Sequence, residues 1–192
     1  MGDAREPAGF DESHSRSENT FCRHALKNAK AHGVRIFVHV PSQTLDLIDA
    51  RGALVRRYAC STSKFGLGFE PGSNRTPTGR FRVAEKHGDE APAGMTFKSR
   101  VATGKFGCED DETDHVQTRI LWLEGLDDDN ANTKSRYIYI HGTNAESRLG
   151  TPASHGCVRM GNADIIDLYE TVPVGTPVEI SAEAEPKRRR RK

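Results

Sequence analysis

The fold is decided by the stretch His141-Gly-Thr-Asn-Ala-Glu-Ser-Arg-Leu-Gly-Thr-Pro-Ala-Ser-His-Gly-Cys-Val-Arg-Met160, which follows the run Arg136-Tyr-Ile-Tyr-Ile140. The aromatic and β-branched residues of that run predict a strand ending at His141-Gly142. A turn of small residues, Ser154-His-Gly-Cys157, then leads toward a helix. One short segment therefore combines a histidine at a strand end with a cysteine in a glycine turn.

Cys157 is the candidate nucleophile of this segment. A cysteine beside glycine in a turn can direct its sulfur outward, and the backbone N–H groups around Gly156 can converge on one point, as an oxyanion hole requires. A nearby imidazole can generate the reactive thiolate, and His141 and His155 are both candidates for that base. Arg159 adds positive potential, which is expected to lower the thiol pKa, and offers a bidentate clamp for a carboxylate.

A zinc site is the alternative interpretation of the same residues, because the side chains of His141, His155 and Cys157 are usual zinc ligands. The single residue between positions 155 and 157 leaves little room for both to bind one tetrahedral ion, and the sequence contains neither CxxC nor HExxH. We therefore predict no metal and no cofactor. The other cysteines lack a comparable neighbourhood and are expected to be structural: Cys22, Cys60 and Cys108.

Working outward, short runs of alternating or apolar residues predict strands at 34–40, 45–48, 54–60, 81–83, 118–123 and 176–180. Residues 61–79 and 84–116 lack such runs and predict long irregular segments. One helix is expected from Asn162, whose side chain can cap it, to Pro173. Without a repeating βαβ pattern, this order predicts a mostly β (mixed α+β) fold, a single β-rich domain with short late helices.

Composition and charge limit the remaining possibilities. The chain of 192 residues suits one domain, and its 28 basic and 27 acidic residues give a net charge of +1, which argues against a globally basic nucleic-acid binder. We also expect no nucleotide partner. No run approaches the roughly 18 apolar residues of a transmembrane segment. Four cysteines are too few for a disulfide scaffold.

The two ends differ in composition from the rest. Residues 1–32 begin with a polar, acidic stretch and are expected to be disordered or weakly helical, and they contain no signal peptide. Residues 182–192 close with six consecutive cations, Lys187-Arg-Arg-Arg-Arg-Lys192, and predict a basic disordered tail. Such a tail can contact polyanions or can simply be a solvated end. Residues 33–181 remain as the folded domain.

The central segment resembles a known family. Ser154-His-Gly-Cys-Val-Arg-Met160, preceded by Ile140-His-Gly-Thr143 and Leu149-Gly-Thr-Pro152, is similar to the signature of the L,D-transpeptidase (YkuD-type) catalytic domain. Thr76-Pro-Thr-Gly-Arg-Phe81 resembles the TPxGxF stretch of that family. The similarity covers roughly residues 34–180. The resemblance implies a β-rich catalytic domain and a cysteine acyl transferase acting on peptidoglycan stem peptides in the cell envelope or periplasm.

The resemblance also implies roles for individual residues. Cys157 would be the nucleophile and His141 the general base, with the Gly142 carbonyl fixing the imidazole tautomer and backbone N–H groups at Gly156 and Cys157 stabilising the oxyanion. The remaining signature residues would bind substrate or shape the site: Thr143, Ser154, His155 and Arg159. D-Alanine would leave, a thioester would form at Cys157, and an amine acceptor would resolve it.

Two other functions stay open at this point. Hydrolysis of the same thioester would give an L,D-carboxypeptidase. A non-catalytic wall- or polyanion-binding module is the alternative from another class, although Cys157, His141 and Gly156 are all present, which argues against a degenerate site.

Overall fold

The computed structural model describes residues 33–109, 111 and 113–183. The expectations for residues 1–32 and for the cationic end of the tail lie outside the described residues. Within them, no helix is both long enough and apolar enough to cross a membrane.

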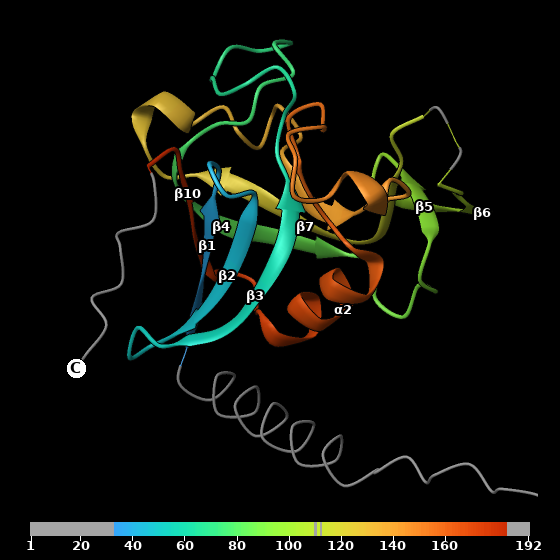
Figure 1. The fold of residues 1–192 in the computed structure, drawn as a ribbon, viewed down its shortest axis with the longest axis horizontal. Helices are drawn as coiled ribbons and strands as arrows, with labels where there is room; N and C mark the ends of the chain where they lie inside the picture. The colour runs from blue at the N-terminus through green and yellow to red at the C-terminus, as the bar shows by residue number, and fades with distance from the viewer. Residues whose placement is uncertain (1–32, 110, 112, 184–192) are drawn as a thin grey trace, which may run out of the picture.

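The described residues form a closed β-barrel (Figure 1). Of the ten strands in the described part of the chain, eight make the barrel wall, and pairing of the first with the last closes it. In wall order they are β4 (Gly79–His87), β10 (Pro177–Ser181), β1 (Val34–His39), β2 (Thr44–Asp49), β3 (Leu54–Ser61), β9 (Val158–Met160), β8 (Tyr139–Gly142) and β7 (Val116–Gly125). Two neighbouring pairs are parallel, β1 with β10 and β8 with β9, and closure leaves the wall without a free edge.

Inward-facing apolar residues alternate with outward-facing residues along the strands, so apolar side chains fill the barrel. In β1, Val34, Ile36 and Val38 are buried, and in β8 and β9 the inward residues include Ile140 and Val158. Successive side chains of a strand point to opposite faces, so the residues between these face outward. The single α-helix of the described residues, α2 (Asn162–Thr171), packs against β7 and β8 and adds three apolar side chains to the same core, Ile165, Leu168 and Tyr169, and its C-cap Val172 adds a fourth.

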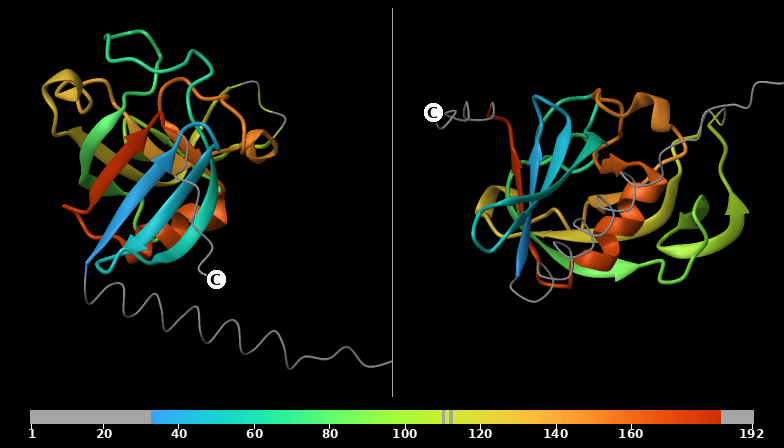
Figure 2. Two further views of the ribbon diagram at one scale, coloured as in Figure 1. Left: turned by 60° about the vertical axis from the view of Figure 1, so that its left-hand side comes forward. Right: turned by 60° about the horizontal axis from the view of Figure 1, so that its bottom comes forward.

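The prediction of an irregular segment at 84–116 is wrong. Strand β4 continues to His87, and β5 (Met95–Lys98) pairs with β6 (Val101–Phe106) in a hairpin whose first strand also pairs with β7. Figure 2 shows this hairpin projecting from one side of the barrel. Every residue of β6 is exposed. A strand without a buried face needs no apolar alternation, and the pattern that identifies strands is therefore missing from its sequence.

Three smaller expectations also need correction. The strand expected at 136–140 begins only at Tyr139, because Tyr137 has a φ of +58° and belongs to a turn. Gly161, not Asn162, is the helix N-cap, and the side chain of Glu146 accepts the first helical N–H at 2.7 Å. Among residues 113–183, the helical elements other than α2 are two 3₁₀ turns, η1 (Asp128–Asn130) and η2 (Glu146–Arg148).

Candidate active site

The register of β8 and β9 places the signature side chains on one face. Ile140 pairs with Val158 and His141 with Arg159, and the Tyr139 N–H reaches back to Cys157. Because Ile140 and Val158 point into the barrel core, His141, Arg159 and Cys157 point outward together. The sequence prediction that one histidine and the cysteine share a site is consistent with this arrangement.

The outward face around Cys157 is covered by apolar and aromatic residues. Ile120, Trp122 and Tyr139 form a second cluster outside the barrel, and Phe97 of β5 and Cys157 pack against it. The hairpin that the sequence did not predict therefore packs against the same cluster as Cys157. Removing water from a site in this way strengthens the electrostatic interactions inside it.

The Cys157 thiol is partly buried and is held by backbone groups. Its Sγ donates to the Tyr137 carbonyl and accepts from the Tyr139 N–H, each at 3.4 Å. Burial raises the pKa of the Cys157 thiol to about 12, against the smaller lowering effects of the Tyr139 N–H and of Arg159. Arg159 lowers the thiol pKa, as expected, but burial raises it by more.

His141 is a neutral imidazole with a fixed orientation. It is buried, and its Nδ1 donates to the Gly142 carbonyl at 2.7 Å, which requires the proton on Nδ1 and leaves Nε2 as an acceptor. Burial lowers the pKa of His141 below its ordinary 6.5, although the negative charge of Asp114 opposes this shift. Among the described residues no hydrogen bond joins the His141 ring to Cys157 Sγ.

Gly142 is closely surrounded on its side-chain side. A Cβ added there would lie 2.5 Å from Asn162 Oδ1 and 2.9 Å from the Gln117 carbonyl oxygen. The Asn162 side chain also donates to the Thr143 carbonyl at 2.9 Å. Asn162 therefore fixes the backbone that follows His141. The sequence had indicated only a helix-capping role for this residue.

The turn before Cys157 is held by the hydroxyl of Ser154, which belongs to the turn, and by Thr76, which is distant in the sequence. Ser154 Oγ donates to the Cys157 carbonyl at 2.6 Å and accepts the Gly156 N–H at 3.2 Å. Thr76 Oγ1 donates to the Gly156 carbonyl at 2.9 Å, which links the Thr76-Pro-Thr-Gly stretch to the turn. Gly156 has a φ of +120°, and its backbone conformation therefore favours glycine.

Ser154 and Thr143, both expected to bind substrate, are fully buried in internal contacts. Thr143 Oγ1 accepts the Ala145 N–H at 3.1 Å, and Ser154 closes the turn. The Gly156 N–H, expected near an oxyanion, already has Ser154 as its acceptor. Substrate or oxyanion contacts for these three residues stay predictions.

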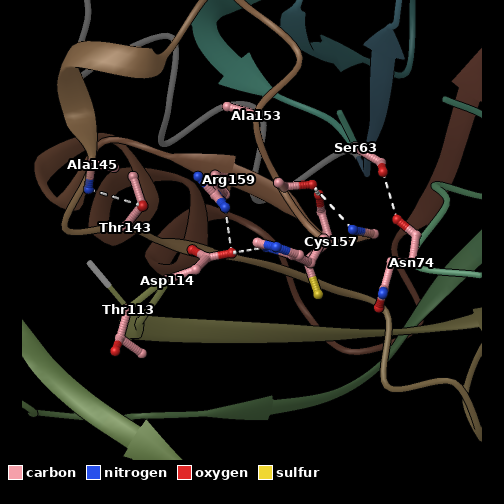
Figure 3. A network of polar contacts seen from close by, with 12 residues as sticks. Ser63, Asn74, Thr113, Asp114, Thr143, Ala145, Ala153, Cys157 and Arg159 are labelled. Carbon is pink, nitrogen blue, oxygen red and sulfur yellow. Dashed lines mark hydrogen bonds and ion pairs between the residues drawn. The ribbon is translucent and has the colours of Figure 1, made fainter. Parts of the chain in front are cut away.

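Arg159 and His155 meet at a carboxylate that the sequence analysis did not single out. The buried Arg159 guanidinium donates through Nη2 to Asp114 Oδ2, and the same oxygen lies 3.2 Å from His155 Nδ1. Figure 3 shows the Asp114 carboxylate facing Arg159, with Cys157 beside them. The carboxylate that Arg159 binds in this structure therefore belongs to the protein itself.

A polar pocket of about 400 Å³ lies beside these residues. Three cations and three carboxylates are among the side chains that line it: Lys64, Arg148, Arg159, Glu109, Asp111 and Asp114. His155 also lines it, with its ring against Phe65 at a centroid distance of 5.6 Å. Cys157 is not among its lining residues, but His155 and Arg159, two positions before and after the cysteine in the chain, are. Its mixed charge suits a ligand that carries both an amine and a carboxylate.

The zinc alternative finds no support in the described part of the chain. Within it, no group of three or more histidine, cysteine, aspartate or glutamate side chains is placed to hold a metal ion. His155 lies against Asp114, while the Nδ1 of His141 is bound to a carbonyl.

A β-barrel that presents a cysteine and a tautomer-fixed imidazole on the outer face of two parallel strands holds the two groups that an enzyme domain with a cysteine nucleophile requires. Residues 33–180 match the L,D-transpeptidase catalytic domain family (YkuD), and the chain belongs to this family. The family is one of cysteine transpeptidases that act on the peptidoglycan of the cell wall.

Individual relatives agree with this assignment. YkuD from Bacillus licheniformis is 27% identical over 156 residues, 81% of this chain and 70% of that protein. YbiS from Escherichia coli (strain K12) is 57% identical over 44 residues, 23% of this chain and 14% of YbiS. The solved L,D-transpeptidase from Xylanimonas cellulosilytica (residues 123-326) shares the fold, with a TM-score of 0.51 and 24% identity over 78% of this chain and 60% of that one. The chain thus covers well under two thirds of several relatives.

The thiol environments predict an order of cysteine labelling in which the candidate nucleophile Cys157 is not first. Burial raises the pKa of Cys60, as of Cys157, to about 12, whereas Cys108 is exposed. Among these three, limiting iodoacetamide at pH 7 is therefore expected to label Cys108 first, because the thiolate is the reactive species. Peptide mass mapping of the folded protein measures the order. Faster labelling of Cys157 would show that its thiolate is stabilised in the free enzyme after all.

Proposed function

We propose that this protein is a cysteine acyl transferase that acts on peptidoglycan stem peptides through a thioester at Cys157. Residues 33–181 would be the catalytic domain, working in the cell envelope. The observation that carries this proposal is the hydrogen bond from His141 Nδ1 to the Gly142 carbonyl, on the face that Cys157 shares. That bond orients a neutral imidazole with Nε2 available to accept a proton, which is the arrangement a general base requires.

The chemistry follows from the two pKa shifts. The Cys157 thiol is protonated and His141 is neutral, so both groups start in the states that proton transfer needs. Because the thiol pKa lies well above that of the imidazole, the proton moves to His141 as sulfur attacks the carbonyl of the third stem residue, rather than before the attack. The backbone N–H of Cys157 would stabilise the tetrahedral oxyanion, because the Gly156 N–H already donates to Ser154 Oγ. His141 then protonates the departing amine of D-alanine.

Binding of the stem peptide is assigned to the pocket beside Cys157. Arg159 and Asp114 line it together with the exposed cations and carboxylates around them. A ligand that carries a carboxylate and an amine would pair with side chains of both signs there. His155, half-exposed at the pocket, would contact the same ligand, and Thr143 and Ser154 would support the backbone around it.

The acceptor that resolves the thioester decides between two outcomes. An amine gives cross-linking, and water gives hydrolysis by an L,D-carboxypeptidase; both share the same acyl-enzyme. The apolar cover of Ile120, Trp122 and Phe97 around Cys157 favours an amine acceptor, because it reduces access of water to the thioester.

Incubation with a carbapenem, a β-lactam that acylates thiols, tests the proposal. The intact protein is expected to gain the mass of one carbapenem, because ring opening by Cys157 forms a thioester without a leaving group. Peptide mapping should place the adduct on Cys157. A protein that gains no mass, while a mixture with purified tetrapeptide muropeptides also releases no D-alanine, would be the non-catalytic binding module.

We further propose that the cationic tail contacts polyanionic wall material. Deleting residues 184–192 is expected to leave release of D-alanine from a small muropeptide nearly unchanged and to weaken sedimentation with intact, anionic wall. The weakening should shrink as salt rises, because exposed charges are screened over about 8 Å at physiological ionic strength. Sedimentation assays at increasing salt measure both effects. A large loss of small-substrate turnover would contradict this assignment, since it would place the tail at the catalytic domain.

A further inference from the structure

Asp114 is held in place from both sides by one asparagine. Asn144 Nδ2 donates to the Thr113 carbonyl at 3.0 Å, and Asn144 Oδ1 accepts the His115 N–H at 3.0 Å. The same Nδ2 also donates to the Cys108 carbonyl at 3.1 Å. The residues before and after Asp114 are therefore bound to a side chain from the segment that follows β8. This arrangement fixes a carboxylate from the segment before β7 against the turn that carries Cys157.

The carboxylate then contacts the signature on both sides of Cys157. Its Oδ2 accepts from Arg159, two residues after the cysteine, and faces His155 Nδ1, two residues before it. The Arg159 side chain is only 3% exposed, and Asp114 is its one ion-pair partner among the described residues. A buried guanidinium without a counter-charge is strongly unfavourable, so Arg159 depends on Asp114 for its position.

Asp114 and Arg159 act on the thiol in opposite directions. The negative charge of Asp114 raises the pKa of Cys157, whereas the positive charge of Arg159 lowers it. The other charged and titratable groups that act on this thiol are Arg136, from the turn before β8, and Tyr139 of β8, while the imidazole of His141 lies on the same face. Each of these two opposite charges therefore offsets part of the effect of the other on the thiol pKa.

We propose that Asp114 is a positioning residue of this active site, which orients the His155 ring and the Arg159 guanidinium around Cys157 and balances the charge of Arg159. This inference rests on the proposed acyl transfer for its role in turnover. The charge balance itself can be measured without that reaction, through alkylation of the thiol.

The test compares Asp114→Asn, Arg159→Met and the double variant, with Asp128→Asn as the control for loss of an exposed carboxylate in η1. The readout is the iodoacetamide rate of Cys157 between pH 7 and 9, followed by peptide mapping. Asp114→Asn is expected to raise this rate about tenfold, which corresponds to a fall of about one unit in the thiol pKa. Arg159→Met is expected to lower the rate, and the double variant to return within about threefold of the wild type.

The variant Asp114→Glu separates the effect of the carboxylate charge from the effect of its position. It retains the negative charge, so its alkylation rate should stay close to wild type. Its longer side chain displaces the carboxylate from His155 and Arg159, so acylation by a carbapenem should slow by about tenfold or more, consistent with the loss expected from a small misplacement of catalytic groups. The control Asp128→Asn should leave both rates unchanged.

Labelling of Cys60 shows whether a variant has merely destabilised the fold, because this cysteine is fully buried in the barrel core. The proposal is overturned if the two single variants change Cys157 alkylation in the same direction, if neither changes it, or if Cys60 labelling rises in step with Cys157. If the alkylation pattern appears as expected but no variant or wild type is acylated, the proposed acyl transfer fails while the charge balance at Asp114 stands.

Discussion

Replacing Cys157 with serine is expected to remove the covalent carbapenem adduct from the intact mass spectrum. The serine hydroxyl is a much weaker nucleophile than a thiol, and its proton is harder for a neutral imidazole such as His141 to remove. Loss of a covalent nucleophile costs on the order of 10⁶-fold in turnover, so release of D-alanine should also fall below detection. Mass spectrometry after timed incubation measures the first effect, and a muropeptide assay the second.

Cys108→Ser is the matched control for this variant. Cys108 is exposed and lies in the segment that contributes Asp114, but its thiol makes no hydrogen bond among the described residues. This variant should form the adduct at the wild-type rate. An adduct that persists in Cys157→Ser and disappears in Cys108→Ser would move the nucleophile to the other cysteine.

Replacing His141 with alanine is expected to slow acylation by about 10²–10⁴-fold, the usual contribution of a general base. The loss should shrink as pH rises, because hydroxide can then ionise the thiol that burial keeps protonated. In the wild type, burial lowers the pKa of His141 below 6.5, so the imidazole stays neutral and acylation should persist below that pH. Stopped-flow acylation rates across pH 5 to 10 measure all three features.

His155→Ala provides the comparison for the second histidine. Its ring is about half exposed and contacts Asp114, not the backbone that orients a base. Acylation should therefore fall less than in His141→Ala, and the wild-type pH profile should persist at reduced amplitude. The reverse pattern, with the pH profile lost in His155→Ala and retained in His141→Ala, would exchange the roles of base and site-shaping residue.

Much of the barrel follows from local sequence. The strand at 34–39 alternates buried apolar residues with more exposed ones, and the strands at 44–49 and 54–61 carry short apolar runs beside a turn, patterns that can be read directly. The helix face of Ile165, Leu168, Tyr169 and Val172 is equally local. Strand β6 could not be found in this way because both of its faces are exposed, and β9 has only three residues.

The candidate site, too, follows partly from local sequence and partly from tertiary structure. The sequence by itself determined the family, the nucleophile candidate Cys157 and the base candidate His141, because these residues lie in one short motif whose chemistry depends on residue type and spacing. Only the tertiary structure decided that burial keeps the thiol protonated and that Asp114 faces Arg159 and His155. Both depend on strand register and on contacts between segments about 45 residues apart, which local sequence patterns do not encode.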